Sequence, residues 1–314
     1  MVAAGLAVLL SSSLAHAQDD TASCALGYAN DSSQTRIDAC SRVIQNGLRV
    51  GKGFEISWAY TSRGSLYEKT GRKNLAFVDY SDAIRFNKNE PYAYANRGSL
   101  YFDDQDYDMA LADFNSQLAV DAQVALENKL GIANAYNGIG RVHVARKEYA
   151  KAVAMFTNAI YSRPTDAPYW SNRGIAFKAL KDYDSAVADF NKALELTPNA
   201  ADYWRRGSAL QLMERWNDAV LDYAKAAQMQ AENGAYHNSH AWALFKTGKA
   251  AEALPVAQKA LALLTNDANS IDTLAHVYEA LGRRDDAVTQ YRRALSINPN
   301  LQESKDGLKR LGVE

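Results

Sequence analysis

The chain has 314 residues, of which 47% are hydrophobic and 23% charged, values that exclude a disordered chain and a bundle of membrane-spanning helices. Its formal net charge of −1 argues against a nucleic-acid-binding protein, because such a protein needs a concentrated basic surface. Frequent alanine, 18 tyrosines and only 6 prolines favour a mostly helical chain packed by aromatic side chains.

Residues 1–17 differ from the rest of the chain. An apolar and small-residue run from Val2 to Leu10 is followed by a small-x-small tripeptide that ends at Ala17. This pattern is typical of a secretory signal peptide cleaved after Ala17, and the run is too short to span a membrane. No Lys or Arg precedes the run, so two alternatives stay open: a signal that is atypical or starts upstream, and a frayed N-terminus of a cytosolic protein.

The two cysteines, Cys24 and Cys40, follow the predicted cleavage site closely. In an exported protein an even cysteine count predicts a disulfide, which would close a loop of ~15 residues and contribute about 3 kcal/mol. The alternative is a pair of free buried thiols in a cytosolic protein, and a zinc site would need more ligands. The signal and the cysteines together predict a periplasmic or secreted protein.

Short segments recur along the remainder of the chain. Tyr94 to Gly98 (YANRG) resembles Trp170 to Gly174 (WSNRG), and an aspartate followed by an aromatic residue recurs at 79–80, 113–114, 189–190 and 222–223. The spacing of about 34 residues is that of the tetratricopeptide repeat (TPR), and the sequence resembles that family over most of its length. Seven copies can be placed, at residues 57–90, 91–124, 133–166, 167–200, 200–233, 234–267 and 268–301.

Positions are counted from the first residue of each copy. Position 8 is small in every copy (Gly64, Gly98, Gly140, Gly174, Gly207, Ala241 and Ala275). Position 20 is always alanine (Ala76, Ala110, Ala152, Ala186, Ala219, Ala253 and Ala287). Position 24 is aromatic except at Ala257, and position 27 is alanine except at Gln117. The resemblance implies an all-α fold: a right-handed α-solenoid of stacked antiparallel helix pairs, a TPR superhelix whose small residues let helices approach closely.

Four copies carry an arginine at position 7 and an aspartate at position 23, whereas the other three carry neither. Because the two positions change together, we predict four structural ion pairs that join the two helices of a repeat. The alternative is a set of separate surface charges. The predicted pairs are Arg63 with Asp79, Arg97 with Asp113, Arg173 with Asp189, and Arg206 with Asp222.

The ends of the array are predicted to be caps. Residues 18–56 are interpreted as a disulfide-tied N-terminal cap with a partial repeat, in which Cys40 takes the aromatic position of a second helix. Residues 302–314 are interpreted as a C-terminal cap, whose short amphipathic helix would cover the last repeat with Leu308 and Leu311.

Two irregularities interrupt the pattern. Residues 125–132 are an insertion, and we expect the second helix of the second repeat to run on and stop near Gly131. Pro255 lies inside the second helix of the sixth repeat, where it should kink the helix or delay its start.

The sequence contains few candidates for catalysis or metal binding. His237, His240 and His276 have helical spacing, but His240 falls at a core position and no carboxylate completes a metal site. The glycine pair at 138 and 140 does not follow a strand, as a phosphate-binding loop would require, and no hydrolase or zinc-protease motif occurs. We therefore expect no catalytic residue, no metal, no cofactor and no enzyme activity.

The resemblance implies that the first helix of each repeat lines a groove that binds an extended peptide or a partner protein. Amide groups there can bond a peptide backbone, and aromatic groups offer contact area. The implied groove residues are Trp58, Tyr92, Asn96, Phe102, Asn137, Arg141, Asn172, Lys178, Trp204, Arg205, Gln211, Asn238, Trp242 and Phe245.

Three functional hypotheses follow from these predictions. The leading one is an exported protein-interaction scaffold or assembly factor without nucleic-acid binding or a membrane span. The second is a structural array that associates with itself as a homo-oligomer. The third is an enzyme of unrecognised type, because function depends on sites and not on folds.

Overall fold

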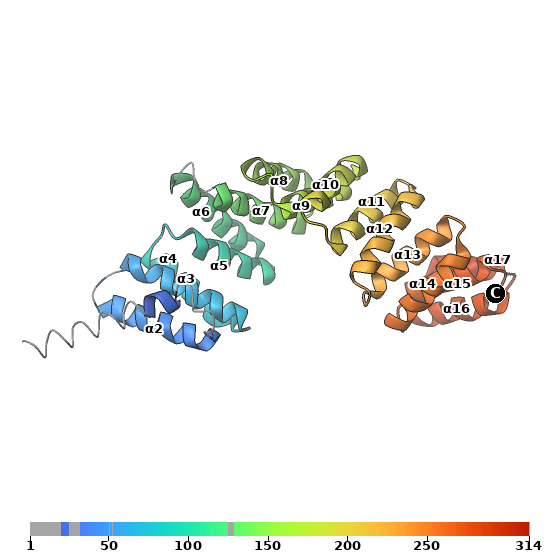
Figure 1. Ribbon diagram of the computed structural model, residues 1–314, viewed down its shortest axis with the longest axis horizontal. Helices are drawn as coiled ribbons and strands as arrows, with labels where there is room; N and C mark the ends of the chain where they lie inside the picture. Colours follow the sequence, from blue (N-terminus) through green and yellow to red (C-terminus); the bar gives the residue numbers. More distant parts are fainter. Residues whose placement is uncertain (1–19, 25–31, 50, 52, 125–128, 314) are drawn as a thin grey trace, which may run out of the picture. The chain divides into compact units, whose positions relative to one another are not determined.

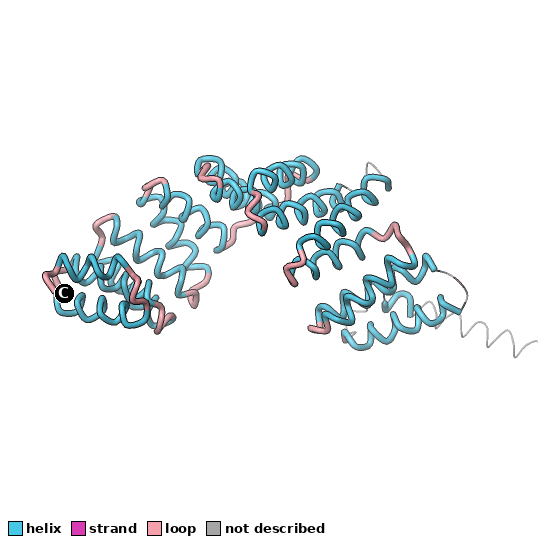
Figure 2. Tube along the Cα trace, turned by 180° about the vertical axis from the view of Figure 1, so that it is seen from behind, coloured by secondary structure: helices cyan, strands magenta, loops and turns pink. Residues whose placement is uncertain are grey.

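The computed structural model describes residues 20–24, 32–49, 51, 53–124 and 129–313, and these residues form helices and turns without any strand (Figure 2). The predicted all-α solenoid of antiparallel helix pairs is confirmed. The chain divides into two compact units, Met1–Pro164 and Thr165–Glu314, and each is described by itself. The predicted signal peptide, residues 1–17, lies outside the described residues.

The described part of unit 1 starts with a short helix at residues 20–24, and its longer helices pack as antiparallel neighbours (Figure 1). The closest packing joins α3 to α4, α5 to α6, and α7 to α8, so each sequence repeat forms one hairpin. The helices are α2 (Ser33–Arg49), α3 (Gly53–Lys69), α4 (Lys73–Phe86), α5 (Pro91–Asp103), α6 (Tyr107–Val124), α7 (Lys129–Ala145) and α8 (Tyr149–Ser162).

Unit 2 contains four hairpins and a final single helix (Figure 1). Its helices are α9 (Ala167–Ala179), α10 (Tyr183–Leu196), α11 (Ala200–Leu212), α12 (Trp216–Met229), α13 (Gly234–Lys246), α14 (Ala250–Leu263), α15 (Ala268–Ala280), α16 (Arg284–Ile297) and α17 (Gln302–Arg310). Leu308 of α17 is buried, and Leu311, which directly follows α17, packs against the core of the unit, so the two cover the end of the last hairpin.

In the five hairpins that have glycine at position 8, the core depends on an aromatic ring that packs against that glycine. A Cβ atom added to Gly140 would lie 2.6 Å from Phe156, and one added to Gly174 would lie 2.9 Å from Phe190. The same close approach joins Gly64 to Tyr80 and Gly207 to Tyr223. The absence of a side chain at position 8 therefore creates the space that the ring at position 24 occupies.

Each of the four arginines at position 7 forms a two-pronged ion pair with the aspartate at position 23 of its own hairpin. Arg63 Nε and Nη2 donate to the two carboxylate oxygens of Asp79, both at 2.8 Å, and the other three pairs have the same arrangement. The aspartates are buried and the arginines mostly so. The paired geometry explains why arginine occurs at this position and lysine does not.

Arg63, Arg97 and Arg206 also form a hydrogen bond with the preceding hairpin or cap. Arg63 Nη1 donates to Ser41 at 2.9 Å, Arg97 Nη1 to Ser81 at 3.2 Å, and Arg206 Nη1 to Asn191 at 2.7 Å. Each guanidinium thus joins three helices.

The turn between the two helices of a hairpin requires a left-handed backbone at position 15. Glycine fills this position at Gly71, Gly248 and Gly282. In four other hairpins the position holds a residue with a side chain and φ between 57° and 63°: Gln105, Lys147, Lys181 and Glu214. A side chain in this region costs about 1–2 kcal/mol.

We expect Lys147→Gly to raise the free energy of unfolding by about 0.5–1 kcal/mol, because it removes this strain at a smaller entropic cost. Urea denaturation is the measurement. Lys151→Gly is the matched control, since it places glycine inside α8 and should destabilise the protein by about 1 kcal/mol. A Lys147→Gly variant less stable than the wild type would contradict the expectation.

The second helix of the second repeat runs on as predicted, since α6 has 18 residues where α4 and α8 have 14. The predicted end near Gly131 is wrong, because α6 ends at Val124 and Gly131 lies inside α7. Glycine is required at position 131 because α7 packs closely against α6 there: a Cβ atom would lie 2.5 Å from the Asp121 carboxylate. The buried Gln117 donates to the Gly131 carbonyl at 3.1 Å, which explains its departure from alanine at position 27.

Pro255 does not delay the start of α14. The helix begins at Ala250, the same position at which α10 begins in its own repeat at Tyr183, and it continues through Pro255 to Leu263. The hydrogen bond from Ala253 N to Lys249 O, at 2.9 Å, closes the first turn before the proline is reached.

The N-terminal cap is held by a disulfide and an ion pair. Cys24 and Cys40 are bonded, which ties residues 20–24 to α2, and both cysteines are completely buried. Arg42 donates to Asp20 at 2.7 and 2.9 Å, which adds a second link between the same segments.

Candidate functional site

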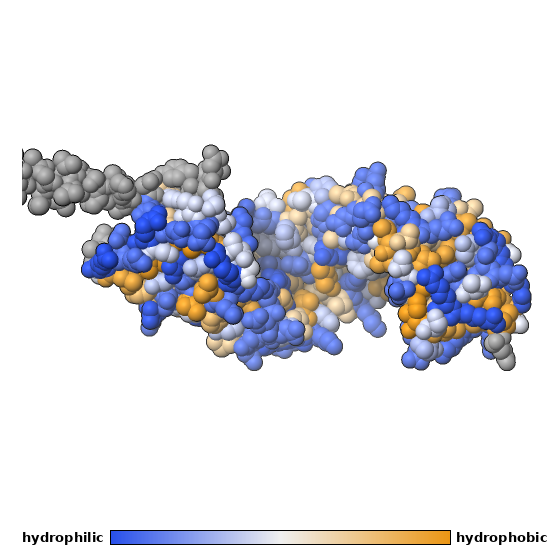
Figure 3. Space-filling view, turned by 90° about the horizontal axis from the view of Figure 1, so that it is seen from below, coloured by the Kyte–Doolittle hydropathy of each residue, from blue (hydrophilic) through white to orange (hydrophobic). Residues whose placement is uncertain are grey.

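The residues implied as groove contacts lie on the first helices of the hairpins: on α3, α5 and α7 in unit 1, and on α9, α11 and α13 in unit 2. Their surroundings differ. Some line pockets, and others are occupied by bonds within the fold. The surface is mixed on the face in Figure 3, where hydrophobic patches are interrupted by hydrophilic residues.

In unit 1 the structure brings together Trp58, Tyr92 and Asn96, which line one pocket between α3 and α5. Phe102 and Arg141 form a second group, in which the guanidinium lies 4.4 Å from the ring centroid. Asn137 is half-buried on α7, four residues before Arg141.

In unit 2 a polar and aromatic row joins α9, α11 and α13. Lys178 Nζ donates to Ser208 at 3.1 Å and lies 5.9 Å from the Trp204 ring. The Trp204 indole donates to Ser239 at 3.0 Å. Burial lowers the pKa of Lys178, with a smaller contribution from Arg205. Asn172 is half-buried on α9.

Two of the implied groove residues are engaged by the fold. Gln211 accepts a hydrogen bond from the buried Tyr223 hydroxyl at 2.8 Å, and Arg205 donates to Asp202 and Ser171. These contacts hold hairpins together, so both side chains have a structural role whatever else they contact.

The most complete site lies where α13, α15 and α17 meet, and we call it the C-terminal pocket. It has a volume of about 480 Å³ and is lined by Trp242, Phe245, Lys246, His276, Glu279, Ala280 and Arg310. Three rings form its wall: the centroids of Trp242 and Phe245 are 5.3 Å apart, and each lies within 5.4 Å of the His276 ring. Trp242 and Phe245 were implied by the resemblance, whereas the other residues were not.

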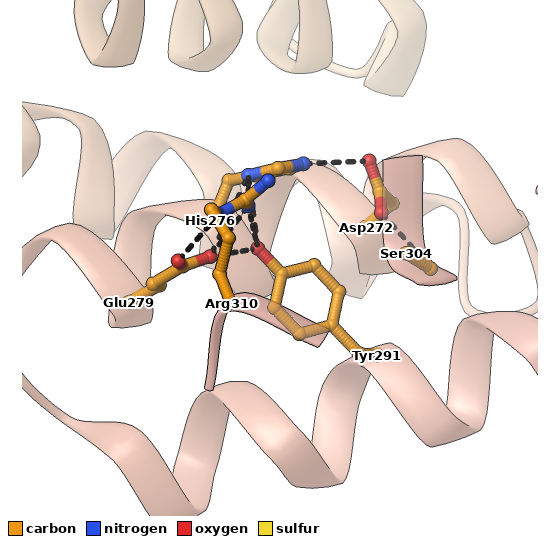
Figure 4. Close-up of polar contacts among 6 residues, drawn as sticks. All are labelled: Asp272, His276, Glu279, Tyr291, Ser304 and Arg310. Carbon is orange, nitrogen blue, oxygen red and sulfur yellow. Dashed lines mark hydrogen bonds and ion pairs between the residues drawn. The ribbon is translucent and has the colours of Figure 1, made fainter. Parts of the chain in front are cut away.

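Three residues that line the C-terminal pocket, His276, Glu279 and Arg310, belong to a hydrogen-bonded cluster with Tyr291 (Figure 4). The Tyr291 hydroxyl donates to Glu279, and its oxygen lies 2.9 Å from His276 Nδ1. Arg310 donates from Nε and Nη2 to the two oxygens of Glu279, both at 2.8 Å. These bonds fix the His276 ring in the wall of the pocket.

On the other side of His276, the buried Ser304 hydroxyl donates to Asp272, whose second oxygen lies 3.5 Å from His276 Nε2 (Figure 4). Burial lowers the pKa of His276 to about 4, with Arg310 adding to the shift, and burial raises the pKa of Asp272 to about 6. The imidazole is therefore neutral at pH 7, and the wall of the pocket carries no charge there.

The two shifts predict a pH-dependent stability with opposite signs. His276 binds its proton less tightly in the folded state than in the unfolded state. The stability that its neutral form contributes to the folded protein is therefore lost as the pH falls from 6.5 towards 4. The raised pKa of Asp272 has the reverse effect, because the cost of burying its charge is present above pH 6 and relieved as the pH falls towards 3.8.

We therefore expect His276→Gln to gain about 2 kcal/mol of unfolding free energy relative to the wild type between pH 7 and pH 4.5. The reason is that glutamine has no proton to gain. Urea denaturation at both pH values measures the difference in unfolding free energy between the variant and the wild type. A difference that does not change with pH would contradict the expectation.

One part of this cluster, the bond between Tyr291 and Glu279, could have been found in the sequence, because positions 12 and 24 of the repeats change together. Where position 24 is tyrosine, position 12 is a carboxylate or amide that accepts its hydroxyl: Glu68 for Tyr80, Gln211 for Tyr223 and Glu279 for Tyr291. Where position 24 is phenylalanine or alanine, position 12 is Phe102, Val144, Lys178 or Phe245. The extra hydroxyl needs a buried acceptor.

The three histidines considered as metal ligands have separate surroundings. His237 Nε2 lies 3.0 Å from the Ala231 carbonyl, burial lowers the pKa of His240 to about 4, and His276 belongs to the C-terminal pocket. Within the described part of the chain, no three His, Cys, Asp or Glu residues are grouped as a metal site would require. Nor does any helix described here have the length and apolar character to cross a membrane.

Comparison with known proteins identifies the repeats. Models of the tetratricopeptide repeat match residues 91–160, 167–200 and 268–301. A search of curated proteins found no match.

Solved structures share the fold. A chain of the APC/C hetero-tetramer Cut9-Hcn1 is 18% identical with a TM-score of 0.61; the match covers 88% of this chain and 52% of that one, so this chain spans about half its length. A tetratricopeptide repeat protein from Parabacteroides merdae is 17% identical with a TM-score of 0.54, over 82% of this chain and 98% of that one. The MamA RS-1 ArsTM double mutant is 18% identical with a TM-score of 0.51, over 56% of this chain and 97% of that one.

Proposed function

Because this chain is a tetratricopeptide-repeat protein, a class of protein-interaction scaffold, we propose that it binds an extended segment of a partner protein on its first helices. The observation that carries the proposal is the C-terminal pocket, where Trp242, Phe245 and His276 form an aromatic wall. In this proposal an apolar side chain of the partner enters that pocket. Buried aromatic anchors supply most of the free energy in such interfaces.

The charges around the pocket favour a partner segment with an acidic residue beside its apolar anchor. Arg310 is neutralised by Glu279, but Lys246 is exposed and forms no ion pair with any described residue. Its ammonium group lies 5.8 Å from the Trp242 ring and 5.3 Å from the Trp216 ring, which places a positive charge at the rim. A carboxylate on the partner would complement it.

The test is a pull-down from an extract of the source cells, followed by titration of the captured partner. We expect Trp242→Ala to weaken binding by about 10–100-fold, the usual effect of removing an aromatic anchor. Trp204→Ala should weaken it less, because this ring lies farther along the row on α11.

Leu221→Ala is the control, since Leu221 is 71% exposed on the second helix α12 and lines no pocket described above. A partner that binds the wild type, Trp242→Ala and Leu221→Ala equally would refute the proposed site.

We also propose that the protein is exported to the periplasm or secreted, where it serves as a scaffold or assembly factor. The buried Cys24–Cys40 bond supports this location, because disulfides persist in oxidising compartments. Cell fractionation, with the mass of the mature N-terminus, is the test. The second candidate, a self-associating array, predicts a mass that rises with concentration in light scattering, and a strict monomer would reject it.

A further inference from the structure

A second pocket lies in unit 1, where the N-terminal cap meets the first two repeats. It has a volume of about 440 Å³, and Trp58, Tyr92 and Asn96 form one side of it. Two cations, Arg36 of α2 and Lys69 of α3, line the same pocket. We call it the cap pocket.

The half-buried Arg36 side chain has a hydrogen-bond donor without an acceptor and lacks a carboxylate partner among the described residues. Its Nη2 donates to the Cys24 carbonyl at 3.4 Å, but its Nε is buried and has no hydrogen-bond partner. It forms no ion pair with any carboxylate in the described part of the chain, in contrast to the paired arginines at position 7. A buried donor of this kind is costly to leave unsatisfied, so it points to a missing acceptor.

Lys69 is exposed at the end of α3 and likewise has no carboxylate partner among the described residues. The single acid in the cap pocket is Glu90, which accepts a long hydrogen bond from Ser57, at 3.5 Å, and lies at the N-terminus of α5. Burial raises the pKa of Glu90, and hydrogen bonds from Ser57 and the Tyr92 amide oppose that shift. Neither Arg36 nor Lys69 forms an ion pair with it. Two cations and one acid leave an excess of one positive charge.

We propose that the cap pocket binds a carboxylate, with the fork of Arg36 and the Lys69 ammonium group as its cations and with Trp58 and Tyr92 against the adjoining apolar group. A single excess positive charge suits a singly charged carboxylate better than a phosphate dianion. The carboxylate belongs to a peptide, as a chain end or an acidic side chain. The proposal therefore rests on the proposed function and adds the chemistry of a second contact.

The disulfide has a specific part in this site. The carbonyl that holds Arg36 belongs to Cys24, and Cys24 is bonded to Cys40 on the same helix that carries Arg36. Breaking the bond frees residues 20–24 from α2, so the guanidinium loses its fixed position. Reduction should weaken carboxylate binding while the C-terminal pocket is unaffected.

The experiment uses the full chain and a small probe instead of a partner protein. Acetyl-Ala-Phe with a free carboxylate, its C-terminal amide and inorganic phosphate are titrated while the indole N–H signals are followed by NMR; Trp58→Phe assigns the signal of Trp58. We expect the free carboxylate to shift that signal, the amide to bind at least about fivefold more weakly, and phosphate to bind more weakly than the carboxylate.

Arg36→Gln should weaken carboxylate binding by about tenfold and Lys69→Gln by about threefold, whereas Arg49→Gln, an exposed change on the same helix, should have no effect. Lys69 is on the surface, so its variant tests the proposal even if Arg36→Gln fails to fold. Equal binding of acid and amide, tighter binding of phosphate, or indifference to both substitutions would overturn the proposal. None of these results affects the C-terminal pocket, which the Trp242→Ala pull-down tests separately.

Discussion

Replacing Asp113 by methionine while Arg97 remains should lower the free energy of unfolding of unit 1 by about 3–5 kcal/mol. Asp113 is 3% exposed and accepts both prongs of the Arg97 guanidinium at 2.8 Å. In the variant the guanidinium keeps only its bond to Ser81 and remains mostly buried as an uncompensated charge. Urea denaturation followed by circular dichroism measures the change.

The third repeat suggests a second substitution that should restore the lost stability. The third repeat has Ile139 at position 7 and Met155 at position 23, an apolar pair at the places of Arg97 and Asp113. We expect the double variant Arg97→Ile with Asp113→Met to recover most of the loss, because it removes the buried charge together with its partner.

Asp108→Met is the matched control for this experiment, because Asp108 lies on the same helix and also pairs with an arginine, Arg146, but its side chain is 91% exposed. Its effect should stay within about 1 kcal/mol. If Asp113→Met were as mild as Asp108→Met, the pairs would be surface charges without a structural role.

Removing the disulfide should cost about 3 kcal/mol, and the loss should be confined to the N-terminal end. The Cys24–Cys40 bond closes a loop with a sequence separation of 16, which sets the size of the entropic contribution. Because hairpins contact mainly their neighbours, the effect should fade along the chain. Hydrogen exchange of the Cys24→Ala and Cys40→Ala double variant should show faster exchange in α2 and α3.

Two comparisons check this expectation. Wild-type protein under reducing conditions should behave like the double variant, and amides in α13 to α16 should exchange at the same rate in all three samples. Unchanged protection in α2 after reduction would show that the ion pair between Arg42 and Asp20, with the packing around it, is sufficient to hold the cap.

The repeated features of the fold could be predicted because each is local and recurs. The glycine at position 8 and the ring at position 24 lie in one hairpin, and the chain repeats that contact with only small changes. The arginine–aspartate pairs were visible for the same reason, since both positions change together from copy to copy.

Features that occur only once in the chain could not be predicted by comparing the repeats with one another. Gln117 departs from the pattern because it bonds the Gly131 carbonyl across an insertion, and no other copy shows that arrangement. The repeat positions identify Trp242 and Phe245 of the C-terminal pocket, but Arg310 and Ser304 come from α17, a helix outside the repeats, so the repeat pattern does not identify them. Arg36 was missed in the same way, because it belongs to the cap.

The backward bonds from Arg63, Arg97 and Arg206 have a mechanical consequence. Each joins its own hairpin to the preceding hairpin or cap through Ser41, Ser81 or Asn191, so opening that junction under tension breaks a charged hydrogen bond as well as apolar packing. When such a protein is stretched between two partners, these junctions should yield at higher force than junctions held by packing alone, so extension proceeds in discrete steps.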